Sequence, residues 1–189
     1  MKTRKIILSL AIAQLVLFAI EIMTQYDTSV RQFALALTNI AVTGAIVLVE
    51  RWLNKKSSQL SWITILFVAG AIWLDALGNF QHMYAGFWWW DRVTHTVGGM
   101  ALSAGFIDYF GSLARRQAIV ASTSVAIWLG FLSGQLLGAI YEISEWLGDY
   151  WFHTERVRGQ YDTPHDLFQN LVGGLIVLFI FWLSRKRKL

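Results

Sequence analysis

The sequence AIYEISEWLGDYWFHTERVRGQYDTPHDLFQN, residues Ala139–Asn170, joins the ends of two strongly apolar segments. Four carboxylates and an amide lie at or just inside those ends: Glu142, Glu145, Asp162, Asp166 and Asn170. An ionised side chain in the hydrocarbon core of a bilayer costs about 2.5–3.5 kcal/mol even on the lenient insertion scale. These groups must therefore be paired, hydrated or bound to a ligand, and the stretch marks the position of a polar site.

The composition of the whole chain is that of an all-α integral membrane protein. The 189 residues are 56% hydrophobic and include a single proline. Apolar runs of about 20 residues, the length that crosses a bilayer, recur along the chain. We expect one domain over residues 1–189, a bundle of about six transmembrane helices. The chain has no cysteine, which excludes disulfides, thiolate nucleophiles and cysteine metal ligands.

Six apolar segments define the expected spans, at residues 6–23, 33–52, 60–79, 92–110, 118–147 and 164–183. The first segment resembles a signal peptide, but it is longer than a usual signal core and no small-residue cleavage site follows it. We therefore interpret it as an uncleaved helix. The aromatic residues of the loop at 80–90 are typical of a membrane–water interface.

Basic residues predict the orientation of the bundle. Most of the 16 Lys and Arg residues cluster in the N-terminal head, the second and fourth connections and the C-terminal tail. The positive-inside rule then places both termini in the cytoplasm, as in a multi-pass protein of a bacterial-type cytoplasmic (inner) membrane. The net charge of +4 is explained by these orientation signals, so the partner that we expect is the lipid bilayer and not nucleic acid.

Polar residues follow helical spacing in the four later spans. The four stripes are Asp75, Asn79 and His82; Asp91 and His95; Glu142, Glu145 and Asp149; and Asp162, Asp166 and Asn170. Glycines lie beneath three of them, and glycine lets helix backbones approach closely. We therefore expect the stripes to face the bundle interior and to meet in one outward-facing polar cup.

Some of these residues also have structural interpretations. Asp162-Thr163-Pro164 is typical of a helix start, where a capping Asp or Thr precedes Pro. Capping does not explain Asn170, which lies nearly two turns further inside. Asp91 has the same capping alternative, and Asp75 can serve as a structural hydrogen-bonding group between helices.

Three motifs resemble a known family. They are the WDRVTH sequence at 90–95, the Glu-x-x-Glu of Glu142 and Glu145, and the Asp162-to-Asn170 pattern followed by Gly173-Gly174. Together they resemble the YjdF-like small bacterial inner-membrane proteins and, more distantly, the VanZ-like proteins, which are associated with glycopeptide resistance. The resemblance implies a multi-span bundle with an outward polar site, and it implies no chemistry.

Our first functional hypothesis is a metal-dependent hydrolase or transferase that acts on a lipid or lipid-linked envelope molecule at the outer leaflet. Carboxylates and imidazoles suit zinc, manganese, iron or magnesium. We expect the metal ligands and catalytic groups to be His95, Glu142, Glu145 and Asp166. The expected supporting residues are Asp75, Asn79, Asp91, Asp162, His165 and Asn170, and the expected phosphate contacts are Arg156 and Arg158.

Two other functions stay open. The first is a membrane protein that binds a lipid or a partner without catalysis, in which case the polar cluster is a satisfied network that fixes helix register. The second is a transporter or proton-handling protein. The inner parts of the spans, such as 65–73 and 175–182, are almost purely apolar, which argues against a polar path through the bundle.

Overall fold

The computed structural model describes residues 60–186 throughout and, before them, only single positions between Ser9 and Trp52. Those single positions are helical. Most of the expected spans at 6–23 and 33–52, and much of the basic head and tail, thus lie outside the described residues.

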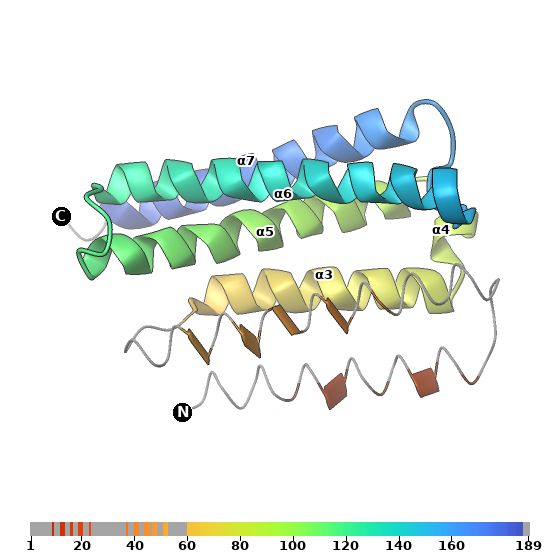
Figure 1. Ribbon diagram of the computed structural model, residues 1–189, viewed down its shortest axis with the longest axis horizontal. Helices are drawn as coiled ribbons and strands as arrows, with labels where there is room; N and C mark the ends of the chain where they lie inside the picture. Colours follow the sequence, from red (N-terminus) through yellow and green to blue (C-terminus); the bar gives the residue numbers. More distant parts are fainter. Residues whose placement is uncertain are drawn as a thin grey trace.

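Within the described part the fold is all-α (Figure 1). Its helices are α3 (Trp62–Phe80), α4 (Met83–Gly86), α5 (Trp90–Arg115), α6 (Thr123–Phe152) and α7 (Asp162–Lys186). Of these, α3, α6 and α7 are long and apolar enough to cross a membrane. The expected span at 92–110 falls in α5, which does not meet that criterion among the described residues.

The helices extend beyond several of the expected spans because hydrogen-bonded helix continues past the apolar core of a segment. Helix α5 runs to Arg115 and α6 to Phe152, each five residues beyond the expected end. The start of α6 is capped by Ser122, whose Oγ accepts from the N–H of Val125 at 3.3 Å. Its end is set by His153, which adopts a left-handed conformation (φ 53°) and donates its N–H to Asp149 O.

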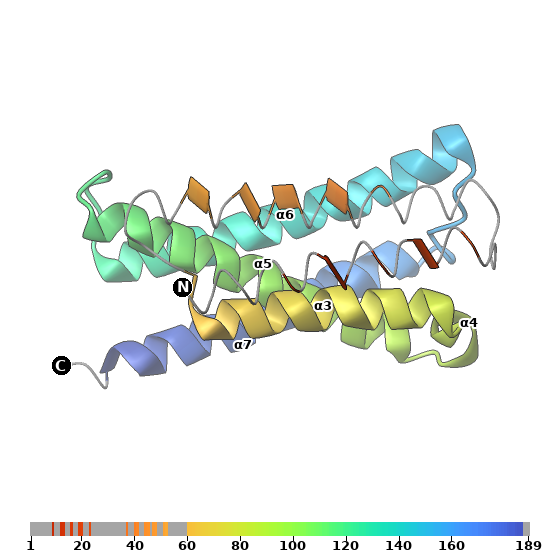
Figure 2. The same cartoon turned by 90° about the horizontal axis from the view of Figure 1, so that it is seen from below.

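Helix α5 lies at the centre of the described bundle. It packs against α3, α6 and α7, and α6 and α7 also pack against each other (Figures 1 and 2). A helix with neighbours on three sides exposes little surface to lipid, so it tolerates more small and polar residues than a peripheral span. This position accounts for the lower apolarity of α5.

Glycines allow this close packing. A Cβ at Gly99 of α5 would collide with the backbone of Asn170 in α7, and one at Gly173 of α7 would collide with Thr96 O in α5. A Cβ at Gly134 of α6 would lie 2.7 Å from the Cα of Ser103. The backbones of α5, α6 and α7 therefore meet directly beneath the polar stripes.

The half of the bundle that lies away from the polar stripes contains an apolar core. Ala104, Ile107, Ile127 and Val177 are buried against one another. Below them Asp108 of α5 accepts hydrogen bonds from Ser61 N and Thr64 Oγ1, both at 2.7 Å. Asp108 thus ties the first turn of α3 to α5, and we assign it a structural role.

Candidate functional site

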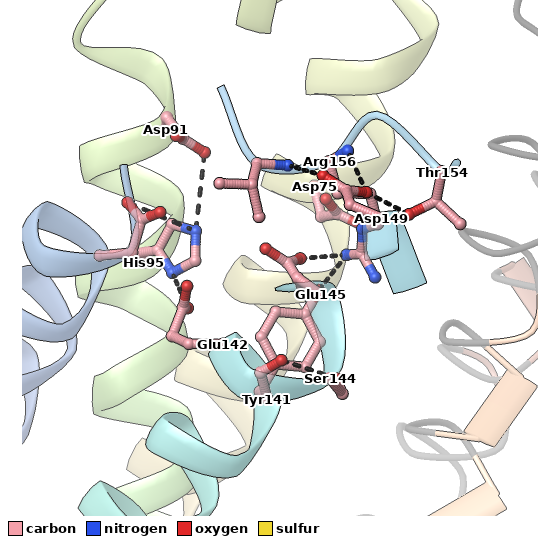
Figure 3. A network of polar contacts seen from close by, with 12 residues as sticks. Asp75, Asp91, His95, Tyr141, Glu142, Ser144, Glu145, Asp149, Thr154 and Arg156 are labelled. Carbon is pink, nitrogen blue, oxygen red and sulfur yellow. Dashed lines mark hydrogen bonds and ion pairs between the residues drawn. The ribbon is translucent and has the colours of Figure 1, made fainter. Parts of the chain in front are cut away.

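His95 lies at the centre of the polar residues, where α5, α6 and α7 meet (Figure 3). Its Nδ1 is 3.2 Å from Glu142 Oε1 of α6. Its Nε2 is 3.6 Å from Asp91 Oδ1, one turn earlier on α5, and 3.7 Å from Asp166 Oδ1 of α7. The imidazole thus has carboxylates on both nitrogens, contributed by three helices.

Glu142 is the most deeply buried of these acids, with 1% of its side chain exposed. In the described part of the chain its Oε1 has no hydrogen-bond partner of good geometry, although His95 Nδ1 lies near. Leaving a buried carboxylate oxygen unsatisfied costs several kcal/mol unless a charge nearby compensates it. The arrangement therefore calls for positive charge on or beside the imidazole.

Among the described residues, Asp91, His95 and Asp166 lie close enough together that they could hold a metal ion. One ligand atom from each lies within 4.8 Å of the other two. In a tetrahedral ion with bonds of about 2.1 Å, ligand atoms lie about 3.4 Å apart. The two distances from His95 Nε2, 3.6 Å and 3.7 Å, are close to that spacing. An ion held by one imidazole and two carboxylates fits zinc, manganese or iron better than calcium.

Glu142 lies on the opposite side of the imidazole from this group. A histidine that binds a metal through one ring nitrogen usually donates the other N–H to a carboxylate or carbonyl, which fixes the tautomer and the ring orientation. Glu142, which the sequence led us to expect among the ligands, is placed where it could fill that role. Asp91, expected as a supporting residue, is one of the three side chains that could hold an ion.

Glu145 has a different partner. It forms an ion pair with Arg156 Nη2, from the loop after α6. The same Nη2 donates to Tyr141 Oη at 2.5 Å, and the guanidinium lies over the Tyr141 ring, 5.3 Å from its centre. Burial lowers the pKa of Arg156, but Tyr141, Glu145 and Asp75 together raise it above its ordinary value. Arg156 therefore stays charged and neutralises Glu145.

Asp149 anchors this loop at the end of α6. Its carboxylate accepts from the backbone N–H groups of Arg156, at 2.8 Å, and Val157, at 2.7 Å, and from Thr154 Oγ1. These bonds position the Arg156 guanidinium beside the Glu145 carboxylate (Figure 3). Asp149 thus acts as a support for the loop.

Asp75 belongs to a neighbouring network on α3 and α4. Its Oδ1 accepts from Asn79 Nδ2 at 3.2 Å and from Tyr84 Oη at 2.8 Å. Burial and the nearby Asp75 raise the pKa of Tyr84 well above its ordinary value, so the phenol keeps its proton and donates it. Asp75 of α3 thus accepts a hydrogen bond from Tyr84 of α4, the structural role that we named for it as an alternative.

The remaining expected residues take various positions. Asn170 is buried beside Gly99 and Gly138. Asp162 is in the first turn of α7 and accepts from Arg158 N at 2.7 Å. His165 is exposed, with its ring 6.4 Å from that of Tyr161, and does not join the group around His95.

Gln135 and Ser103 extend the polar region further into the bundle, and neither was among the site residues expected from the sequence. Gln135 Nε2 donates to Ser103 Oγ at 3.2 Å and to Asn170 O at 3.4 Å. Ser103 lies eight residues after His95 and Gln135 lies seven before Glu142, so both continue their stripes at helical spacing. That periodicity is the signal that could have found them.

A family model described as "Predicted membrane protein (DUF2238)" matches residues 6–187 of the chain. No curated protein and no solved structure matches the chain. The match supports a membrane protein and leaves the resemblance to the YjdF-like and VanZ-like proteins as a prediction.

Proposed function

The chain belongs to the DUF2238 family of predicted membrane proteins, and we propose that its polar site binds a divalent metal ion and acts with it on a lipid or lipid-linked molecule at the outer face of the membrane. The observation that carries the proposal is the arrangement around His95. Its Nε2 faces Asp91 and Asp166, and its Nδ1 faces the buried Glu142.

The charge balance of the region supports a cation. Five acids lie in or beside the site, against three arginines in the same region, Arg92, Arg156 and Arg158, of which Arg156 forms an ion pair with Glu145. The five are Asp75, Asp91, Glu142, Glu145 and Asp166. Like charges held close together in a low-dielectric region repel strongly. A divalent ion between Asp91, His95 and Asp166 would offset this repulsion.

The depth of the site favours a lipid substrate. Exposed aromatic residues gather in the loops and helix ends at the same end of the bundle, as in the interfacial belts of membrane proteins. They are Trp88, Trp89, Tyr150, Trp151, Phe152 and Tyr161. His95 is five residues into α5 and thus about 7 Å below its start. A lipid headgroup at the interface would lie at that depth.

A divalent ion in this site would supply a Lewis acid and a source of metal-bound hydroxide. The chain's own groups would hold it: Asp91 and Asp166 as oxygen ligands, and His95 as a nitrogen ligand oriented by Glu142. Glu145, expected among the ligands, would remain paired with Arg156 and shape the side of the site.

Metal analysis of the purified full chain tests the proposal. We expect about one divalent ion per chain, lost in Asp166→Asn and in His95→Gln and kept in the matched control Glu155→Gln, an exposed acid in the loop after α6. If added zinc, manganese or magnesium leaves the thermal stability of the chelator-treated protein unchanged, the proposal is overturned. Turnover by fully metal-free protein would overturn the metal-dependent step alone.

The structure bears differently on the two other functions, transport and binding without catalysis. In the described residues Ala104, Ile107 and Val177 separate Ser103 from Asp108, so the polar groups form no continuous path along α5, which argues against transport. Binding without catalysis uses the same contacts as the proposed enzyme. Metal retention without metal-dependent turnover of any envelope lipid would favour that alternative.

A further inference from the structure

We propose that Gln135 is a positioning residue, which holds α5, α6 and α7 in the rotation that brings two carboxylates to His95; as a statement about the metal site, this rests on the proposed function. Gln135 lies near the middle of α6, and its side chain reaches both neighbouring helices. Its Nε2 donates to Ser103 Oγ of α5 at 3.2 Å and to the backbone oxygen of Asn170 in α7 at 3.4 Å. One amide group thus joins the three helices that carry the site.

The amide of Gln135 occupies a space that a glycine leaves open. A Cβ at Gly174 of α7 would collide with Gln135 Nε2, so any larger residue at that position would displace the amide. On the α5 side, Ser103 is fully buried and presents its hydroxyl to the same nitrogen. No water replaces such partners in the hydrocarbon region of a membrane. The position of the Gln135 amide is therefore determined by both neighbouring helices.

These hydrogen bonds lie beneath the group around His95. Gln135 precedes Glu142 by seven residues, which is close to two helical turns, so the two side chains lie on the same face of α6. Asn170 follows Asp166 by four residues, about one turn of α7. The two bonds are therefore about 10 Å below Glu142 along α6 and about 6 Å below Asp166 along α7.

The hydrogen bonds of Gln135 fix a property that glycine packing leaves free. Contacts between glycine backbones determine how closely two helices lie, whereas a hydrogen bond weakens steeply as its angle changes and so restricts rotation. A rotation of α7 by about 10° would move a carboxylate that lies about 6 Å from the helix axis by about 1 Å. Asp166 Oδ1 is 3.7 Å from His95 Nε2, so a shift of that size away from the ring would leave the two atoms too far apart to share an ion.

A second hydrogen bond between these helices involves only two of them. Thr96 Oγ1 of α5 donates to Gln169 Oε1 of α7 at 3.0 Å. That bond includes no residue of α6, the helix that supplies Glu142. The contact between Glu142 and His95 Nδ1 therefore depends on Gln135 for the rotation of α6 relative to α5.

Histidine NMR of the metal-free protein tests the inference without reference to the metal. The full chain, labelled with ¹⁵N-histidine in detergent micelles, gives ring signals for four histidines, and His95→Gln identifies those of His95. Gln135→Met keeps the length of the side chain and removes both hydrogen bonds. We expect Gln135→Met to shift the ring ¹⁵N signals of His95 and to leave those of His153, an exposed residue after α6, unchanged.

Ser103→Ala is a milder variant that removes only the acceptor on α5. We expect it to shift the His95 signals less than Gln135→Met does, because the bond to Asn170 O remains. The double variant should shift them no further than Gln135→Met alone, since Ser103 acts through Gln135. Additive shifts would contradict a shared role of the two side chains.

Ile127→Val is the matched control for lost stability, because it removes one methyl group from the apolar core on the same helix. It should lower the melting temperature without shifting the His95 signals. Unshifted His95 signals in Gln135→Met, or an equal shift in Ile127→Val, would overturn the inference.

Zinc titration of the chelator-treated full chain separates this inference from the proposed function. We expect Gln135→Met to lower zinc affinity about tenfold, the lower end of the effect of residues that orient metal ligands. Shifted His95 signals in Gln135→Met, together with no zinc uptake by the native chain, would remove the metal proposal alone. Normal zinc uptake with unshifted His95 signals in Gln135→Met would remove the positioning role alone.

Discussion

His95 Nδ1 lies 3.2 Å from Oε1 of Glu142, a carboxylate that is buried in α6. The contact joins the two central helices of the site and turns the other ring nitrogen, Nε2, toward Asp91 and Asp166. Glu142 thus lies on the Nδ1 side of the imidazole, and Nε2 is the nitrogen that faces the other two carboxylates.

The first prediction concerns this orienting contact. Replacing Glu142 with Gln keeps the shape of the side chain but removes the charge that stabilises a proton on Nδ1. We expect zinc or manganese affinity to fall about 10–100-fold, as for other carboxylates behind a metal-binding histidine. Isothermal titration of the chelator-treated protein measures the change. The control is Ser144→Ala, two residues away and exposed, whose hydroxyl donates to Tyr141 O of the same helix. Unchanged affinity in Glu142→Gln would refute the orienting role.

A second prediction concerns the buried ion pair of Glu145 and Arg156. Arg156→Ala leaves the Glu145 carboxylate buried without its partner, which typically costs about 3–5 kcal/mol. The double variant Glu145→Leu/Arg156→Met should recover most of that loss, because it removes both charges. Denaturant unfolding in mixed micelles measures the free energy of unfolding of the native chain, the two single variants and the double variant. Additive losses in the double variant would show that the two side chains are not coupled.

The arginine of this pair should stay charged throughout the ordinary pH range. The folded-state pKa of Arg156 is raised, so its contribution to stability is fully present below the unfolded value and is lost only as pH rises through the folded value. Both values lie far above neutrality, since unperturbed arginine titrates at about 12.5 or higher. Arg156 should therefore be charged at both about pH 6 and about pH 9. A change in the cost of Arg156→Ala between these pH values, measured by denaturant unfolding, would then report protonation of Glu145 and not loss of the arginine charge.

Helical spacing predicted much of the site. The intervals between Asp91 and His95 and between Asp166 and Asn170 placed each pair on one face, and the glycines beneath them indicated which face meets another helix. Two rows of polar residues on different helices converge only if those helices pack closely, and Gly99 and Gly173 supply that packing. For that reason the sequence could predict that His95 and Asp166 lie close together.

The partner of Glu145 could not be predicted from helical spacing. Glu145 shares a face with Glu142, which led us to expect it beside His95. Its actual partner, Arg156, comes from an irregular loop whose path depends on the hydrogen bonds accepted by Asp149. Periodicity describes regular helices, so it carries no information on where such a loop returns.

The third prediction contrasts two adjacent glycines of α5. A Cβ at Gly99 would collide with the backbone of Asn170, whereas a Cβ at Gly98 would meet no atom within 4 Å. Gly99→Ala should force α5 and α7 apart and cost about 1–3 kcal/mol. Gly98→Ala should be neutral or slightly stabilising, because alanine favours helix. Thermal unfolding of both variants in the same detergent gives the comparison. Equal melting temperatures would show that the α5–α7 contact is looser than described.

The last prediction tests the orientation expected from the basic residues. The chain contains no cysteine, so single cysteines can be introduced without altering native thiols. Gln160 lies exposed in the loop between α6 and α7 at the site end, and Ala118 lies exposed between α5 and α6 at the other end. If the positive-inside rule holds for this chain, Gln160→Cys reacts with a membrane-impermeant maleimide in intact cells, and Ala118→Cys reacts only after the membrane is opened. The reverse pattern would place the His95 site on the cytoplasmic face. It would also move the expected lipid substrate from the outer to the inner leaflet, while the contacts of His95 with Asp91, Glu142 and Asp166 would keep their geometry.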